Sequence, residues 1–165
     1  MNDLEAPTAP PRNRQRPLGP QRRGRVLALQ VLYEVDLTSH DWRESLLAHA
    51  EAVHASPQVI AFAEACLSGV LDDGLELDES IATHAPAWPL AQLAVVDRNV
   101  LRYASYELAF GDAPDRVVLD EAIEIAREFG SARSGAFVNG ILDAMARELR
   151  SGEGSEVPRS CGDAG

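Results

Sequence analysis

Three arginines, Arg22, Arg23 and Arg25, stand within four positions in the stretch QRRGRVLALQVLYEVDL. A guanidinium group pairs with phosphate and stacks on nucleobases, and single-stranded RNA exposes both. The cluster is therefore a candidate RNA-binding site. The charged start of an ordinary surface helix would carry the same residues, so these positions alone leave both interpretations open.

The residue types that catalysis needs are present, but not in catalytic patterns. His49 and His54 are five positions apart, which places them on different faces of a helix, whereas a helical zinc site uses a spacing of four. Ser39, His40 and Asp41 are adjacent in the sequence, but a catalytic triad is assembled in space. No glycine-rich phosphate loop occurs in the sequence. We therefore expect a binding protein that is not an enzyme and that uses no cofactor or metal.

Charge is distributed unevenly along the chain. The net charge is −11, yet residues 1–25 hold six arginines against two acidic residues, and the remainder holds nine arginines against 24 acidic residues. The first segment is thus at +4 and the rest at −15. A basic arm on an acidic body is compatible with a small RNA-binding surface, which net charge alone does not exclude.

The length of 165 residues and the 45% hydrophobic content fit one folded domain. Residues 1–20 contain five prolines and 151–165 are polar and glycine-rich, so we expect disordered segments on either side of a domain over 21–150. The sequence shows no apolar run of about 18 residues and no secretory signal, which predicts a cytoplasmic protein without a membrane partner. Cys66 and Cys161 are expected to be free thiols.

Apolar residues recur at steps of three and four through this domain, and no stretch alternates well enough to predict a strand. Asp120 is expected to N-cap the sixth helix and Ser134 the seventh, while Gly130 ends the sixth. The sequence therefore predicts an all-α fold, a compact bundle of about seven helices over 22–37, 42–54, 57–71, 75–85, 90–110, 121–129 and 134–149.

The candidate RNA-binding arginines fall in the first turn of the first predicted helix. Positive charge there opposes the helix macrodipole and costs up to about 1 kcal/mol unless an anion offsets it. We therefore expect an anion close to Arg22, Arg23 and Arg25.

The segment FVNGIL, residues 137–142, contains the Asn-Gly pair that favours a tight hairpin turn. As a strand it would put apolar and polar residues on both faces, whereas a helix gathers Val138, Ile141 and Leu142 on one side. The helix is therefore the better interpretation. Because glycine inside a helix costs about 1 kcal/mol relative to alanine, we expect Gly140 to lie where another backbone approaches closely.

Four separate blocks, RRGRVLALQVLYEVDL, VVDRNVLRYASYEL, VVLDEAIEIAREFG and FVNGILD, occur here in a fixed order and spacing. In that order and spacing the chain resembles the NusB family of transcription antitermination factors over about residues 21–149. The resemblance implies an all-helical protein of about seven helices. It also implies binding to the boxA segment of ribosomal RNA leaders together with NusE, a ribosomal small-subunit protein, within the RNA polymerase antitermination complex.

The resemblance implies site residues on three elements. On the first and last helices it implies RNA contacts at Arg22, Arg23, Arg25, Tyr33, Ser134, Phe137 and Asn139. Arg133 departs from the family, which often has an acidic residue at this position, and is a further candidate for a phosphate contact. On the fifth helix it implies NusE contacts at Asp97, Arg98 and Glu107. Phe137 is equally compatible with a core position, and Glu107 with a structural ion pair. Gly24 stands where the family often has alanine, which weakens the first turn.

Two other functions are compatible with the sequence. The acidic body could serve a protein-binding scaffold in ribosome biogenesis that docks a basic partner. NusB-like domains also precede some ribosomal RNA methyltransferases, so the chain could position RNA for a methyltransferase on a separate chain. A preference for boxA over scrambled RNA would favour the RNA-binding antitermination factor over the protein-binding scaffold.

Overall fold

The computed structural model describes residues 19–72 and 74–152. Within those ranges the chain forms seven α-helices, one short 3-10 helix and no strand, which confirms the all-α prediction. The predicted flanking segments fall outside the described residues except for their inner ends, since the first helix begins at Pro20 and the last ends at Ser151. The elements are α1 (Pro20–Leu37), α2 (Trp42–Ala52), α3 (Pro57–Asp72), α4 (Gly74–His84), η1 (Leu90–Gln92), α5 (Val95–Phe110), α6 (Asp115–Phe129) and α7 (Ser134–Ser151).

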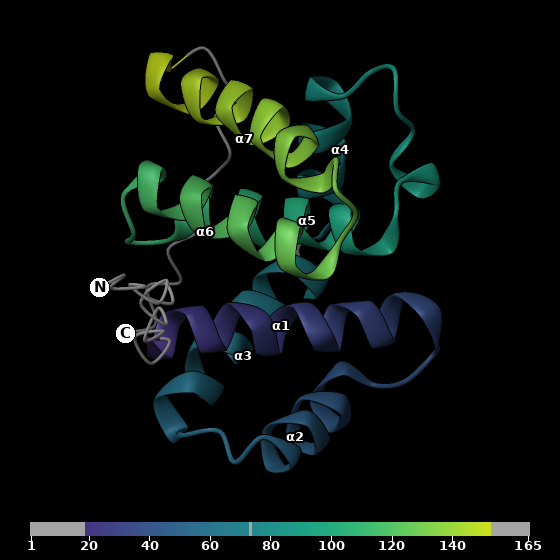
Figure 1. Cartoon of the computed structure of the whole chain (residues 1–165), viewed down its shortest axis with the longest axis vertical. Helices are drawn as coiled ribbons and strands as arrows, with labels where there is room; N and C mark the ends of the chain where they lie inside the picture. Colours follow the sequence, from purple (N-terminus) through teal and green to yellow (C-terminus); the bar gives the residue numbers. More distant parts are fainter. Residues whose placement is uncertain (1–18, 73, 153–165) are drawn as a thin grey trace, which may run out of the picture.

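Helix α1 lies across the middle of the molecule (Figure 1). It packs against α2 and α3 on one side and against α5 on the other, and α6 and α7 complete the second layer. Its apolar face enters a single hydrophobic core, in which Ala28, Val31 and Leu32 are buried. None of the described helices is long and apolar enough to cross a membrane. Cys66 is a buried free thiol, as predicted, and Cys161 lies outside the described residues.

Two helix starts differ from the prediction. Helix α5 begins at Val95 rather than at residue 90, because Leu90–Gln92 forms a 3-10 turn and Leu93 and Ala94 are extended. Helix α6 begins at Asp115, with Pro114 as N-cap, so the prediction that Asp120 caps it is wrong. Asp120 lies inside the helix, exposed, beside Arg116.

The segment FVNGIL lies inside α7, which confirms the helix over the hairpin. Val138, Ile141 and Leu142 are buried in the core as predicted. The expectation for Gly140 is wrong, because the glycine is exposed and a Cβ built there would have no neighbour within 4 Å. A close approach occurs instead at Gly24 in α1, where a Cβ would stand 2.6 Å from the Phe62 ring.

Candidate nucleic-acid interface

Arg25, one of the three arginines of α1, points into the protein. Its side chain is 2% exposed and forms a fork with Glu107 of α5, with Nε donating to Oε2 at 2.8 Å and Nη2 to Oε1 at 2.7 Å. The guanidinium also lies over the Phe62 ring, 5.3 Å from its centroid. Burial would lower the pKa of Arg25, but the hydrogen bonds and charge of Glu107 outweigh it and raise the pKa above its ordinary value.

This pair corrects two predictions. Arg25 is not available to RNA, and Glu107, equally buried, is not available to NusE. The structural ion pair that the sequence left open for Glu107 is the one observed, and its partner is Arg25. A buried charge needs a paired, hydrogen-bonded partner, which explains why both residues occur together in this core.

Arg22 contacts carboxylate groups, which are the anions expected near the start of the first helix. Its guanidinium lies 3.3 Å from Glu121, 3.0 Å from Glu124 and 3.2 Å from Glu128. These carboxylates are three and four residues apart, so they share one face of α6. The Arg22 side chain is only 12% exposed, and it is engaged by the protein's own acidic residues rather than free for a ligand.

Arg23 is the exposed arginine of the three, and its guanidinium has no carboxylate partner among the described residues. It lines a shallow groove between α1, the loop after α2, the start of α3 and the end of α6, together with Val26, Leu27, Gln30, Val53, Val59 and Glu128. Tyr33, further along α1, is also exposed. The exposed face of α1 therefore offers one free cation, a partly apolar groove and one aromatic ring.

Two histidines, His40 in the loop before α2 and His49 on α2, contact Glu34 of α1. Glu34 accepts hydrogen bonds from Ser45 Oγ at 2.9 Å and lies 2.7 Å from both His40 Nδ1 and His49 Nε2. Hydrogen bonds from His40, His49 and Ser45 lower the pKa of Glu34 to about 2. No group of histidine, cysteine and acidic residues in the described ranges could hold a metal ion.

The start of α7 carries three residues that the resemblance implied for RNA and the further candidate Arg133, and the structure separates them. Arg133 and Asn139 are exposed, and Phe137 is half-buried. Ser134 is buried, with its Oγ accepting the backbone N–H of Ser131 at 2.8 Å, so it fixes the turn rather than facing a ligand. The predicted cap is also wrong, because Arg133 occupies the N-cap position without a side-chain hydrogen bond.

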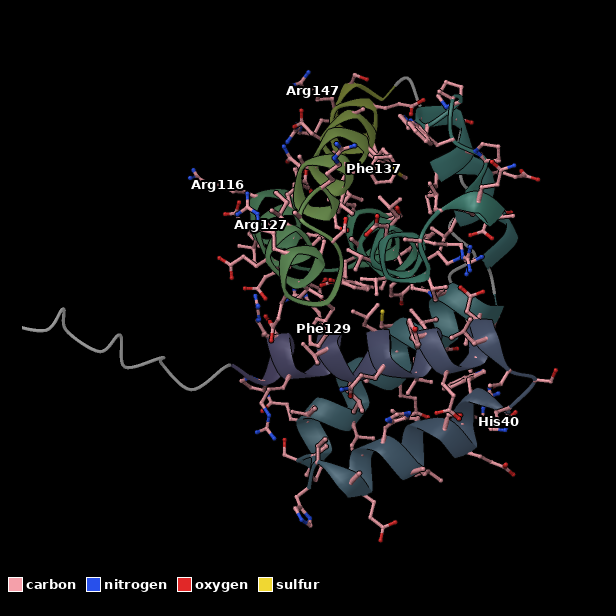
Figure 2. All side chains as sticks on the ribbon, turned by 45° about the vertical axis from the view of Figure 1, so that its right-hand side comes forward. His40, Arg116, Arg127, Phe129, Phe137 and Arg147 are labelled. Atoms are coloured by element: carbon pink, nitrogen blue, oxygen red, sulfur yellow. The ribbon has the colours of Figure 1, made fainter. Side chains whose placement is uncertain are left out.

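Arg127 is a residue that the sequence did not single out. It is exposed in the last turn of α6, and its side-chain stem packs against Gly135 of α7. A Cβ added to Gly135 would stand 2.8 Å from Arg127 Cγ. Figure 2 shows Arg127 on the outer side of α6, with Phe129 below it near α1. The only sequence signal for Arg127 is a basic residue at a helix C-terminus, which the helix dipole favours in any protein.

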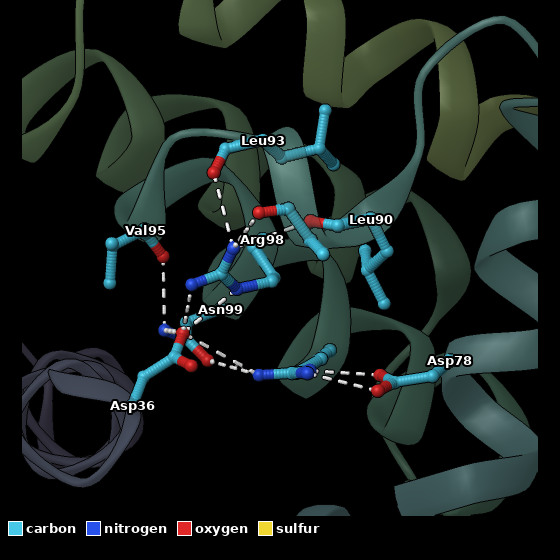
Figure 3. Close-up of polar contacts among 9 residues, drawn as sticks. Asp36, Asp78, Leu90, Leu93, Val95, Arg98 and Asn99 are labelled. Atoms are coloured by element: carbon cyan, nitrogen blue, oxygen red, sulfur yellow. Dashed lines mark hydrogen bonds and ion pairs between the residues drawn. The ribbon is translucent and has the colours of Figure 1, made fainter. Parts of the chain in front are cut away.

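Arg98 of α5, a predicted NusE contact, is engaged inside the protein. Its Nε donates to Asp36 Oδ2 at 2.8 Å, and its Nη1 donates to the carbonyl oxygens of Leu90 and Ala91 at 3.3 Å and of Leu93 at 3.2 Å (Figure 3). These bonds satisfy the carbonyls of the 3-10 turn, which explains why α5 starts late. Arg98 thus fixes the connection between α4 and α5.

The same network ties three helices together. Asn99 donates to Asp36 of α1 at 2.9 Å, and Arg102 forms a fork with Asp78 of α4 at 2.8 and 2.9 Å (Figure 3). Asp97, beside Arg98, remains outside it, since its Oδ1 is shielded from solvent and has no hydrogen-bond partner in the described part of the chain. Asp97 is therefore the member of the predicted NusE set that keeps an unused acceptor.

Comparison with known proteins places this geometry in a family. The sequence profile of the NusB family matches residues 22–147. The chain is 40% identical over 129 residues to the transcription antitermination protein NusB of Trichlorobacter lovleyi, covering 78% of this chain and 91% of that protein. It is 39% identical over 143 residues to the NusB of Desulfatibacillum aliphaticivorans, covering 86% of this chain and all of the relative.

Solved structures agree with this assignment. A NusB of T. maritima superposes with a TM-score of 0.74 at 36% identity, over 79% of this chain and 92% of that one. A structure of antitermination factors NusB and NusE in complex with double-stranded RNA shares the fold, with a TM-score of 0.72 at 24% identity, over 78% of this chain and 96% of that one. From the matched profile, the relatives and the fold, this chain belongs to the NusB family.

Proposed function

We propose that this protein is a non-enzymatic transcription antitermination factor that binds boxA-type single-stranded RNA of ribosomal RNA leaders as a heterodimer with NusE. Its relatives are named for transcription antitermination, and a neighbour of the same fold was solved with NusE and RNA. In this role it serves the RNA polymerase antitermination complex and supports ribosomal RNA transcription in the cytoplasm.

The observation that carries the RNA-binding role is the pattern of paired and unpaired arginines. Eight arginines in the described ranges lie within 4 Å of a carboxylate: Arg22, Arg25, Arg43, Arg98, Arg102, Arg116, Arg147 and Arg150. Three others, Arg23, Arg127 and Arg133, have no such partner among the described residues. We call these three the free arginines.

The free arginines lie on α1, in the last turn of α6 and at the start of α7. Glu128, in the last turn of α6, contacts Arg22 and lines the groove beside Arg23, while the neighbouring Arg127 packs along the start of α7, where Arg133 stands. Unpaired cations on an acidic protein keep their charge available for phosphate. Their location joins the two elements, α1 and the start of α7, that the resemblance implied for RNA.

The NusE contact is proposed at Asp97. Its carboxylate forms no ion pair among the described residues, and because Oδ1 is shielded from solvent, a donor on the partner would bind the other oxygen. Arg98 and Glu107 take no part in this contact, since both are engaged inside the protein.

Fluorescence anisotropy with a boxA oligonucleotide, with and without NusE, tests the function. We expect modest, salt-sensitive binding that NusE strengthens, and a loss of about 0.7 in the log–log salt slope for each phosphate contact removed by Arg23→Ala, Arg127→Ala or Arg133→Ala. Arg116→Ala and Arg147→Ala are matched controls, because both arginines are exposed on α6 and α7 but have an acidic neighbour one turn away (Figure 2).

Two outcomes would contradict the proposal. The RNA interface is wrong if removing all three free arginines weakens boxA binding no more than the two control changes do. Equal affinity for boxA and scrambled RNA, with NusE binding intact, would favour the protein-binding scaffold.

A further inference from the structure

Trp88, in the connection between α4 and α5, is an exposed aromatic side chain that contacts a second ring. Its side chain is 60% exposed. The ring of Phe137 on α7 meets it edge-on, with centroids 6.3 Å apart and planes at 85°. Figure 2 shows Phe137 on the side of α7 that faces α4 and the segment after it. The exposed remainder of the indole is accessible to a ligand.

A shallow groove lies beside this aromatic pair. Its lining comes from the α4–α5 connection and from α7: His84, Ala85, Pro86, Ala87, Trp88, Ala136, Phe137, Gly140 and Ile141. The α7 side is low because Ala136 and Gly140 carry little or no side chain, and space is open above Gly140. No backbone lies close to Gly140, so close packing does not explain this glycine. Its missing side chain instead keeps the groove open next to the two aromatic rings.

We propose that Trp88 and Phe137, with the groove at Ala136 and Gly140, form a stacking site for one nucleobase of the bound RNA. The proposal rests on the RNA-binding function above and extends its footprint from the start of α7 onto the α4–α5 connection. A flat, mainly apolar groove beside an exposed indole suits a planar base, because every base presents a π-face. The site has no requirement for base identity, so it contributes affinity rather than sequence recognition.

The charges around the groove are compatible with the negative backbone of RNA. Arg133, one of the free arginines, stands one helical turn before Phe137 and offers a cation for the phosphate of the stacked nucleotide. The two carboxylates that α7 carries beyond the groove each have a partner: Glu148 contacts His84, and Asp143 pairs with Arg147 at 2.7 Å. A base stacked on Trp88 therefore has its backbone next to a free cation.

Fluorescence of Trp88 reports directly on this contact. The protein has two tryptophans, and Trp42 is 8% exposed in α2, so a Trp42→Phe variant leaves Trp88 as the reporter. We expect boxA RNA, added to the full chain with NusE, to quench Trp88 emission with the same midpoint as the anisotropy titration. If Trp42→Phe does not fold, the difference in emission between the wild type and Trp88→Leu gives the same signal.

Affinity measurements on variants complete the test. Trp88→Leu should weaken boxA binding by about 5- to 150-fold, the range of one base–aromatic stack, and Trp88→Phe should retain most of the affinity. Gly140→Leu should weaken binding by filling the groove. Phe110→Leu is the matched control, since Phe110 is also exposed and packed against another ring, that of Tyr106, but lies at the far end of α5.

The outcomes separate this inference from the proposed function. Unquenched Trp88 emission, or wild-type affinity in Trp88→Leu, would overturn the stacking site while the free arginines still govern binding. A blue shift of Trp88 on adding NusE alone, with no response to RNA, would overturn it in favour of a protein side chain in the groove. If the wild type itself binds no RNA under any condition, the proposed function fails first.

Discussion

The inner and outer sides of α1 place the same residue type, arginine, in opposite environments. On the inner side, Arg25 is enclosed by Glu107 and the Phe62 ring. On the outer side, two positions earlier, Arg23 is exposed beside a groove and has no carboxylate partner in the described ranges. The difference lies in the neighbours. Glu107 of α5 forms a fork with Arg25, whereas Glu128 of α6, which lines the groove beside Arg23, is engaged by Arg22. A cluster of arginines in a sequence therefore shows where charge is concentrated, while the packing of distant helices decides which charge remains available.

The largest effect should come from breaking the inner pair. Arg25→Met leaves Glu107 as a buried, unpaired carboxylate, so we expect the free energy of unfolding to fall by about 3–5 kcal/mol. Arg23→Ala, at an exposed position, should change it by less than about 0.5 kcal/mol while lowering RNA affinity. Urea denaturation measures the first effect, and anisotropy with boxA RNA the second.

The double variant Arg25→Met with Glu107→Leu is the control. Replacing both charges with apolar groups should recover most of the lost stability, because the cost lies in the unpaired carboxylate and not in the missing attraction. If Arg25→Met folds as stably as the wild type and loses RNA affinity instead, then Arg25 reaches the RNA and the comparison between the two sides of α1 is wrong.

The sequence predicted the number of helices but not where two of them begin. Steps of three and four reveal a buried helix face, so α1, α2 and α3 were found close to their observed ends. The late start of α5 depends on Arg98 turning back to the carbonyls of the 3-10 helix, a contact that apolar spacing does not encode. Helix α6 was placed too late because Asp120 is a good N-cap residue in isolation, while Pro114 already provides the start.

The candidate site was predicted less completely, for a physical reason. The residue that removes Arg25 from the surface, Glu107, lies 82 positions away, and the carboxylates that engage Arg22 lie 99 to 106 positions away. Such pairs form only after the helices have packed. Arg127 and Trp88 were missed for the same reason, since their neighbours Gly135 and Phe137 belong to a different helix or connection.

Two helical glycines extend the comparison between inner and outer positions. Gly140 faces open space, so Gly140→Ala should raise the free energy of unfolding by up to about 1 kcal/mol through helix propensity alone. Gly24 faces the Phe62 ring that lies under Arg25, and a Cβ there would stand 2.6 Å from the ring. Gly24→Ala should therefore lower the stability, by about 1 kcal/mol, because overpacking outweighs the propensity gain.

Thermal unfolding of the two variants beside the wild type decides this point. Opposite shifts in Tm are expected. A higher Tm for both would mean that Phe62 moves aside without disturbing Arg25, and that the inner side of α1 is less tightly packed than these distances indicate.

The smallest effect concerns the acidic face of α6 that engages Arg22. Glu124 and Glu128 are the two more exposed of the three carboxylates around Arg22. Changing both to glutamine leaves Glu121 to hold Arg22 but removes two negative charges beside the start of α1. We expect boxA affinity to rise by a few-fold at low salt. The gain should vanish as salt screens the charges, with a Debye length of about 8 Å near physiological ionic strength.

Asp115→Asn with Asp120→Asn, at the other end of α6, makes the same charge change as a control. An equal gain in that control would show that RNA responds to the net charge of the body, whereas a gain confined to the Glu124 and Glu128 pair would show that these carboxylates compete with RNA phosphate for Arg22.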